Sequence, residues 1–451
     1  KENILEPPAD EEIIEPQVIQ NVPSYTINYK YDENDLIGMG GAKSKFKNNI
    51  EAIKTLKKIE SENRLATADE QHILAKYAGW GGIPQAFDAK LSGWEKEYSE
   101  LKGLLEDDEY AAARSSVNTS HYTNKPIIDG IYQALNQFGF NGGNVLEPSM
   151  GIGNFFSLFP EELQDRTNLY GVELDSITAR IAKQLYQDAE ILNNGFEETT
   201  YPNNFFDVAI GNVPFGDYKV YDPEYNRHKF LIHDYFFAKT LDKVRPGGVV
   251  AFVTSKGTLD KKDERVRKYI AERADLIGAI RLPNTAFASA GTEVTADIIF
   301  LQKRERINTN DESWLHIGEN ENGVPVNNYF LEHPDMCLGE MVFDKSMYGE
   351  DSKYTSCISD STEDIAVRIE QAVSKLNARI TERVPAEKNN DNEISENLPA
   401  DPNVRNFTYT FIDDKLYYRN NSIMERVSDI NGTQLERIKG MDNIRRILRN
   451  I

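Results

Sequence analysis

The strongest constraint on the fold is an alternation of short β-rich runs with helical stretches between about Val117 and Arg304. The β-rich runs are NVLEP, LYGVEL, AEILNN, FFDVAIGN, GGVVAFVTS, DLIGAIRL and TADIIFLQK. Stretches between them, such as SITARIAKQLYQ and HDYFFAKTLDKV, carry apolar residues at helical spacing. Such alternation is typical of βαβ units, which build a largely parallel sheet with helices on both faces. The sequence therefore predicts an α/β fold, whose ligands bind beyond the carboxyl ends of the strands.

The segments on either side of this core differ from it in composition and spacing. AIKTLKKIESE and TADEQHILAKYAG have helical spacing, and the glycine-rich break YAGWGGIPQAFD places Trp80 on a turn as a packing residue. The stretch 359–384 has the pattern of an amphipathic helix. The expected regions are an acidic arm or linker at 1–45, a helical region at 46–116, the α/β core at 117–305, a small appendage with the amphipathic helix at 306–385, a flexible linker at 386–403, and a hairpin with a basic helix at 404–451.

The formal charge of the chain is −22, from 51 basic and 73 acidic side chains. Because phosphate neutralisation needs clustered Lys and Arg, this balance is a poor match to a protein whose whole surface binds nucleic acid. A local basic groove stays open as an alternative, with Ser255–Arg273 as its candidate segment. Acidic residues are interspersed there, so an ordinary solvated helix is the favoured interpretation.

Several functional classes are disfavoured by the composition. No apolar run approaches the roughly 20 residues of a membrane span, and no signal peptide is visible. Cys337 and Cys357 are too few for a disulfide framework, and the spacing of His and Cys predicts no metal site. We therefore expect a soluble, cytoplasmic protein without a metal. The chain begins at Lys1 rather than Met, which indicates a processed chain or a fragment of a longer polypeptide.

The first predicted strand runs into NVLEPSMGIGNFF. Glu147 and Pro148 leave the strand, and Gly151 and Gly153 form a tight turn before a helix. Glycines let the backbone approach a ligand closely, and the helix start offers free N–H groups. Phe156 stands where a dinucleotide fingerprint has its third glycine, and no Gly-Lys-Ser/Thr follows. The turn therefore predicts a ligand-binding loop that is neither of the dinucleotide nor of the Walker type.

The next strand ends add groups suited to a nucleoside. LYGVELD ends in Glu173, about twenty residues after the glycine turn, where a carboxylate can accept both hydroxyls of a ribose. The alternative is that Glu173 caps the following helix. NNGFEET, after the third strand, places Phe196 to pack on an adenine ring. The fourth strand ends in Asn212-Val213-Pro214-Phe215, although turn residues are common at any strand end.

In chain order, spacing and content, the segments from His121 to Lys303 resemble the class I, S-adenosylmethionine-dependent amino-methyltransferases, in particular the N6-adenine DNA methylases. The resemblance implies a Rossmann-like fold with a mostly parallel seven-stranded sheet and helices on both faces, an N-terminal helical region and small C-terminal α+β appendages. It implies S-adenosylmethionine as the cofactor, with its methionine end on HYTNKP and its ribose on Glu173. The implied cofactor-binding residues are His121, Tyr122, Thr123, Glu147, Pro148, Gly151, Gly153, Phe155, Glu173 and Phe196.

The resemblance departs from the family pattern at the residue that grips the cofactor adenine. The family has a carboxylate directly before the aromatic residue, whereas here Gly195 precedes Phe196. Glu197 and Asn194 are the two candidates to replace that carboxylate.

The family's catalytic motif, Asn/Asp-Pro-Pro-Tyr/Phe, corresponds here to Asn212-Val213-Pro214-Phe215. An exocyclic amine on a ring is a poor nucleophile because its lone pair is delocalised. The Asn212 side-chain oxygen and the Val213 carbonyl can accept its two hydrogens, which turns the nitrogen toward sp³ and its lone pair toward the methyl group. Pro214 fixes the turn, and Phe215 stacks on a base that has left the duplex. Phe287 in LPNTAFASAG is the candidate second aromatic wall, with an ordinary core phenylalanine as the alternative.

The predicted function is therefore methyl transfer from S-adenosylmethionine to the N6 amine of adenine in double-stranded DNA. Glutamine amides in proteins and bases in RNA remain alternative substrates, and a degenerate cofactor- or DNA-binding module without activity is a further alternative. YAGWGGIPQAFD, SSVNTSHYT and VELDSITARIAKQLY also resemble the methylase segment of large helicase–methylase fusion proteins of bacterial mobile elements and phages. That resemblance implies the helicase region of a longer polypeptide as a partner.

Overall fold

The computed structural model describes two compact units, residues 1–381 and 382–451. The residues described in the first unit are 26–35, 40–118, 123–290, 293–345, 353–359 and 361–381. In the second unit they are 398–399, 404, 408–412, 415–420, 423–427, 435 and 437–441. Most of the expected arm at 1–45, of the expected linker at 386–403 and of the expected basic helix therefore lies outside the described residues.

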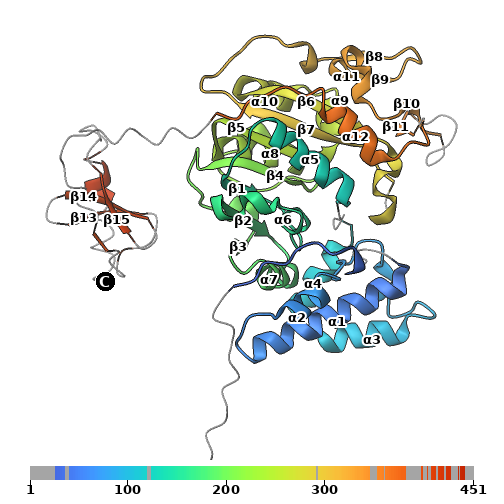
Figure 1. Cartoon of the computed structure of the whole chain (residues 1–451), viewed down its shortest axis with the longest axis vertical. Helices are drawn as coiled ribbons and strands as arrows, with labels where there is room; N and C mark the ends of the chain where they lie inside the picture. Colours follow the sequence, from blue (N-terminus) through green and yellow to red (C-terminus); the bar gives the residue numbers. More distant parts are fainter. Residues whose placement is uncertain are drawn as a thin grey trace, which may run out of the picture. The chain divides into compact units, whose positions relative to one another are not determined.

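A seven-stranded sheet forms the centre of the first unit, with the order β3-β2-β1-β4-β5-β7-β6 (Figure 1). Neighbouring strands are parallel except β7, which is antiparallel to both β5 and β6. This order confirms the Rossmann-like fold expected from the alternation of strands and helices. The strands are β1 (Gly143–Glu147), β2 (Thr167–Glu173), β3 (Glu190–Asn193), β4 (Phe206–Asn212), β5 (Val244–Ser255), β6 (Ala274–Leu282) and β7 (Ala296–Lys303).

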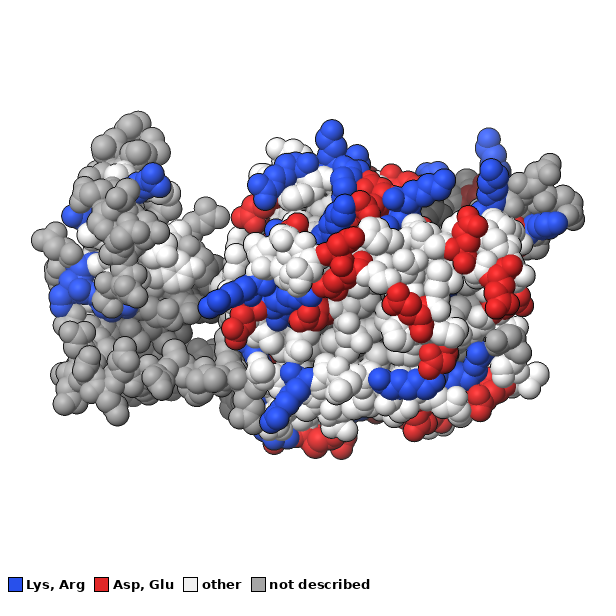
Figure 2. All heavy atoms as spheres, turned by 90° about the horizontal axis from the view of Figure 1, so that it is seen from above, with Lys and Arg blue, Asp and Glu red and all other residues white. Residues whose placement is uncertain are grey.

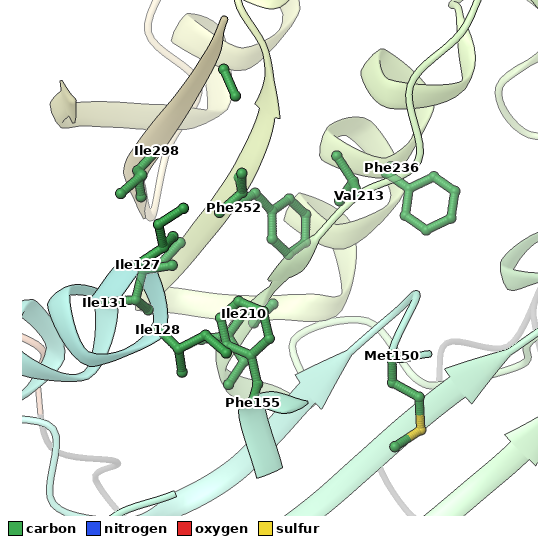
Figure 3. Packing of buried hydrophobic residues seen from close by; sticks show 14 of the residues in the cluster. Ile127, Ile128, Ile131, Met150, Phe155, Ile210, Val213, Phe236, Phe252 and Ile298 are labelled. Atoms are coloured by element: carbon green, nitrogen blue, oxygen red, sulfur yellow. The ribbon is translucent and has the colours of Figure 1, made fainter. Parts of the chain in front are cut away.

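Helices cover both faces of this sheet. α8 (Ile232–Lys243) packs on β5, where the rings of Phe237 and Phe252 lie 5.3 Å apart. α5 (Lys125–Gln137) leads into Phe138, whose ring lies 6.0 Å from that of Phe300 in β7. Phe300 pairs with Ala251, the neighbour of Phe252, and successive side chains of a strand point to opposite faces. The two helices therefore bury opposite faces, and Figure 3 shows the isoleucines of α5 against the sheet.

Four helices of the N-terminal region pack together beside α7 (Ser176–Leu185) (Figure 1). Gln71 donates to the Gln184 and Ile27 carbonyls, at 2.8 Å each. Trp80 is 1% exposed and its ring lies 5.3 Å from that of Phe87, so it is a packing residue as expected. No helix in the described ranges is long and apolar enough to cross a membrane. The four helices are α1 (Ala42–Ser61), α2 (Ala68–Leu74), α3 (Glu95–Leu104) and α4 (Asp107–Ser115).

Shorter elements complete the two units. The first unit also contains α6 (Asn154–Ser157), α9 (Gly257–Asp260), α10 (Arg265–Arg273), β8 (Ile317–Glu319), β9 (Pro325–Asn327), α11 (Asn328–Glu332), β10 (Glu340–Phe343), β11 (Thr355–Ile358) and α12 (Ile365–Val373). The second unit contains a sheet of β12 (Leu398–Pro399), β15 (Ile423–Arg426), β14 (Lys415–Asn420) and β13 (Tyr409–Ile412), in that order. β13 and β14 pair in antiparallel orientation, from Tyr409 opposite Tyr418 to Ile412 opposite Lys415.

Of the amphipathic helix expected over 359–384, α12 forms only Ile365–Val373, and the expectation is wrong for the described residues that follow, up to Thr381. After a turn, the Ile380 N–H donates to the Phe138 carbonyl at 2.8 Å, and the Gln302 side chain donates to the Arg379 carbonyl at 2.7 Å. These bonds to the end of α5 and to β7 require an extended segment. Tertiary contacts therefore override helical spacing here.

We predict that Gly130→Ala destabilises the first unit, because the side chain of Ile369 in α12 packs directly against this residue of α5. A Cβ atom at Gly130 would lie 2.3 Å from Cγ2 of Ile369, which is 1% exposed. Overpacking of this kind costs about 1–3 kcal/mol, which urea unfolding followed by circular dichroism would detect.

Gly103→Ala is the matched control. It changes a glycine in α3 whose added Cβ would meet nothing within 4 Å, so a gain of about 0.5–1 kcal/mol from helix propensity is expected. Equal effects of the two substitutions would contradict close packing at Gly130.

Candidate active site at the carboxyl edge of the sheet

The chain that leaves β1 forms a tight glycine turn. Gly151 and Gly153 have φ of 57° and 86°, the left-handed region that favours glycine. The Gly153 N–H donates to the Met150 carbonyl at 2.8 Å, and the Tyr186 hydroxyl donates to the Gly153 carbonyl at 2.6 Å. A Cβ atom at Gly153 would lie 2.4 Å from the Tyr186 ring. Gly153 is therefore required by both its backbone conformation and the ring beside it.

The Glu173 carboxylate at the end of β2 holds this turn. It accepts hydrogen bonds from the Gly151 N–H at 2.9 Å and from the Asp175 N–H at 2.8 Å. Asp175 is the residue that caps α7, through the Thr178 N–H at 2.9 Å, so Glu173 is not the cap. Burial raises the pKa of Glu173 to about 7. Because a carboxylate has about four acceptor positions, Glu173 retains the capacity to accept hydroxyl groups of a ligand.

Two buried acceptor atoms lie at the ends of the neighbouring strands β1 and β4. Glu147 Oε2 and Asn212 Oδ1 are both buried, and neither accepts a hydrogen bond from any residue that the structure describes. The two strand ends are adjacent, since a Cβ atom at Gly211 would lie 3.4 Å from Glu147 Cγ. Burial, and then the nearby Glu173 carboxylate, raise the pKa of Glu147 well above its ordinary value. Buried acceptors are normally satisfied, so this edge is suited to a ligand that carries N–H or O–H donors.

The segment after Asn212 is fixed at its start and more accessible afterwards. The Val213 N–H donates to the Val253 carbonyl at 3.1 Å, which continues the pairing of β4 with β5. Val213 is 1% exposed, and Figure 3 shows it beside Phe236 of α8. Pro214 and Phe215 are half-buried. The strand thus ends with the Asn212 amide held by paired backbone on a rigid sheet.

The Glu197 carboxylate occupies the space that a side chain at position 195 would need. A Cβ atom at Gly195 would lie 2.3 Å from Glu197 Oε1 and 2.5 Å from its Cδ. Asn194, the other candidate for the missing carboxylate, is exposed. The geometry therefore favours Glu197 of the two.

Phe196 and Phe287 are more buried than a stacking role requires. Phe196 is 2% exposed; its ring lies 5.1 Å from that of Phe236, and the Lys239 ammonium lies 5.2 Å from its centre. Lys239 also donates to the Glu197 carbonyl at 3.1 Å. Phe287 is 1% exposed and lies at a kink between two short 3₁₀ turns within Asn284–Ala290. Stacking of either ring on a base would require local movement, so both roles stay predictions.

The other residues expected to bind the cofactor lie either in the hydrophobic core or near the carboxyl edge of the sheet. Phe155 is 2% exposed and lies in the core beside Ile128 of α5 and Ile210 of β4 (Figure 3). Thr123 is buried just before α5, and Pro148 is buried after β1. His121 and Tyr122 lie outside the described residues.

Two residues at this edge were missed by the sequence analysis. Leu174 follows Glu173 and is 73% exposed, which is unusual for a leucine next to a buried strand. The Asn193 side chain, at the end of β3, donates to the carbonyls of Glu173 and Leu174 at 3.0 Å each. In the sequence, Leu174 could have been noticed as an apolar residue directly after the acidic residue that ends the second predicted strand. Asn193 could have been noticed as an amide at the end of the third predicted strand.

The candidate basic segment is largely neutralised by its own neighbours. Arg265 pairs with Asp263, and Lys268 pairs with Glu264. Arg267 is 1% exposed and donates to backbone carbonyls. These contacts favour an ordinary helix over a DNA-binding groove, and Figure 2 shows basic and acidic residues interspersed over the face in view.

The model of the N-6 DNA Methylase family matches residues 104–362, more than half of the chain. Defense against restriction protein B of Escherichia phage P1 is 28% identical over 291 residues, which are 63% of this chain and 11% of that protein. The chain thus spans about a ninth of the length of that relative.

Solved structures also resemble the chain, with low sequence identity and TM-scores below 0.5. A type I restriction-modification methyltransferase subunit from Streptococcus thermophilus is 17% identical, with 60% of this chain and 62% of that chain covered and a TM-score of 0.37. A candidate class I S-adenosylmethionine-dependent methyltransferase from Listeria monocytogenes is 18% identical, with coverages of 58% and 82% and a TM-score of 0.38.

We predict that Glu173→Gln stabilises the folded chain at pH 8 and has little effect at pH 4. The carboxyl pKa of about 7 in the folded state lies above the ordinary value of 4.5, so ionisation is less favourable in the folded than in the unfolded chain. Folded stability therefore falls as the pH rises from 4.5 through 7, and an amide removes this cost. Since one pKa unit corresponds to about 1.4 kcal/mol, we expect a gain of about 1–3 kcal/mol at pH 8 in urea unfolding. A gain of the same size at pH 4 would show that ionisation is not the cause.

Proposed function

The chain belongs to the N-6 DNA Methylase family, and on this premise we propose that it methylates the N6 amine of adenine in double-stranded DNA. Its activity is S-adenosylmethionine-dependent methyl transfer. The observation that carries the proposal for the substrate is the Asn212 amide oxygen. This atom is buried at a strand end and accepts no hydrogen bond from the described residues, so it is suited to the hydrogen of an amino group.

The residues at the sheet edge fit the cofactor. Glu173 can accept the ribose hydroxyls, and the exposed Leu174 can cover one face of the adenine ring. The Glu197 carboxylate can accept the adenine amino group. Glu147 Oε2, buried and without a partner among the described residues, suits a donor on the methionine end. S-adenosylmethionine supplies an electrophilic methyl group attached to a sulfonium.

The residues after β4 fit an amino-bearing base. The Asn212 amide oxygen and the Val213 carbonyl accept the two amino hydrogens, which raises the electron density on the nitrogen. Pro214 fixes the direction of the chain, and Phe215 stacks on the base. A base within a duplex cannot reach this edge, so the target must first leave the helix at a cost of a few kcal/mol.

The alternatives differ in substrate and in activity. The family match supports DNA, whereas the charge of −22 favours a protein substrate, such as a glutamine amide, over DNA or RNA. The coverage of 11% of the phage relative supports the proposal that the chain functions as one segment of a longer polypeptide, with a helicase region as its partner. Val213 in place of the family's proline would accord with a degenerate module, but the Asn212 amide favours activity.

We expect calorimetric titration to separate cofactor binding from catalysis. Glu173→Ala should abolish binding of S-adenosylmethionine, because the ribose acceptor and the anchor of the glycine turn are lost. Asn212→Ala should retain binding but reduce tritium transfer to duplex DNA by about 10²–10³-fold, the usual effect of losing one stabilising hydrogen bond in the transition state.

The failed outcomes are also distinct. If the unaltered chain does not bind S-adenosylmethionine at millimolar concentration, the proposal that this chain is a methyltransferase is contradicted. Binding with transfer to protein or RNA, and none to DNA, would retain the activity but replace the proposed substrate.

The role of Glu197 can be tested by moving the carboxylate along the chain. Glu197→Ala should weaken S-adenosylmethionine binding by about 10- to 100-fold, since a hydrogen bond to a charged group contributes about 1.5–3 kcal/mol. Adding Gly195→Asp to that variant should restore most of the affinity, because position 195 has ordinary backbone angles of −65° and 146° and the space is then empty. Gly195→Asp alone is the control and should bind more weakly than the double variant. Unchanged affinity in Glu197→Ala would refute this role.

A further inference from the structure

The two cysteines of the chain, Cys337 and Cys357, lie in contact with each other. The chain has 451 residues and only these 2 cysteines, yet their sulfur atoms are 3.8 Å apart. They are 20 positions apart in the sequence, so the fold itself brings them together. Neither forms a disulfide in this structure, and neither belongs to the candidate active site.

Both cysteines are held by hydrogen bonds to the edge of the central sheet. Cys337 pairs with Arg281 of β6 in a parallel bridge, and the next residue, Leu338, donates its N–H to the Arg281 carbonyl at 2.8 Å. Cys357 lies in β11 and donates its N–H to the Thr295 hydroxyl at 2.8 Å, just before β7 begins. The two thiols are therefore held on fixed backbone rather than meeting by chance on mobile loops.

The environments of the two thiols differ in a way that suits stepwise oxidation. Cys337 is half-buried, whereas Cys357 is 0% exposed. The hydrogen bond from Cys357, with a smaller contribution from the Arg281 guanidinium, lowers the pKa of Cys337, which favours the reactive thiolate. The hydrogen bond with Cys337, and then burial, raise the pKa of Cys357. Cys337 is thus the thiol that a reagent can reach first.

We propose that Cys337 and Cys357 are a dithiol modification site that forms a reversible disulfide with a low-molecular-weight disulfide, such as glutathione disulfide, as the oxidant. The Cys337 thiolate attacks one sulfur of the oxidant, its S–S bond breaks, and one glutathione thiolate leaves. Cys357 then loses its proton and attacks the Cys337 sulfur of the mixed disulfide, which releases the second glutathione. Two thiols are oxidised, one glutathione disulfide is reduced to two thiols, and reduced glutathione in excess reverses both steps.

The disulfide would join the turn before β10 to β11, beside the edge strand β6 and the start of β7. Closing a loop of 20 residues restricts the unfolded chain, so the oxidised protein should be more stable than the dithiol. The competing interpretation is that the cysteines are only small apolar residues in a packed region. The two interpretations differ in what oxidant does to the native protein.

The experiment treats the native 451-residue chain with glutathione disulfide, then unfolds it, alkylates free thiols with iodoacetamide and measures the intact mass. The unaltered chain should lose both alkylatable thiols together and carry no glutathione. Cys357→Ser should instead retain glutathione on Cys337, because the second thiol is missing. Cys337→Ser should keep its buried Cys357 reduced. Oxidation should raise the melting temperature of the unaltered chain by several degrees and leave both serine variants unchanged.

The intact mass of the unaltered chain tests the proposal without the variants, even if a serine variant folds poorly. Two alkylatable thiols after prolonged treatment would overturn the proposal, whether or not Cys357→Ser accepts glutathione. Glutathione retained on the unaltered chain would overturn it as well, because the second thiol would then be unable to close the bond. A disulfide that forms only after the chain is unfolded would be equally decisive against it.

Discussion

The hydrogen bond from the Gly151 amide to the Glu173 carboxylate joins the two strand ends on which the candidate site depends. It fixes the glycine turn after β1 against the acidic end of β2 at 2.9 Å. The same carboxylate lies near the buried Glu147, so the edge of the sheet holds two acidic groups where ionisation is costly. An arrangement of this kind persists only on a rigid support, which the helices packed on both faces of the sheet provide.

The N-terminal helical region contributes to that support from outside the central sheet. Arg180 of α7 pairs with Glu60 of α1 and Glu109 of α4, at 2.5 and 2.6 Å. α7 begins three residues after Glu173, so its position fixes the direction in which the chain leaves β2. Gln71 binds the carbonyl at the other end of the same helix. The region that precedes the α/β core thus helps to hold the acidic strand end in place.

The fold was predictable from the sequence wherever local pattern and tertiary structure agree. All seven strands of the sheet lie where β-rich runs were identified. The central strands β4 and β7 are buried along most of their length, and such strands leave a dense apolar signal. The end of α12 was not predictable, since the bonds to Phe138 and Gln302 that extend the chain come from segments distant in sequence. Strand-end polar residues such as Glu173 were identified, but the burial of Phe196 depends on α8 and could not be read from spacing.

The contact between Gly195 and Glu197 has a consequence for substitutions at either position. Any residue other than glycine at 195 would displace the Glu197 carboxylate, since one small volume cannot hold both side chains. The two positions are therefore coupled: a larger residue at 195 fits this backbone only if the side chain at 197 turns away or becomes smaller. A sequence pattern that treats the two positions as independent would miss this coupling.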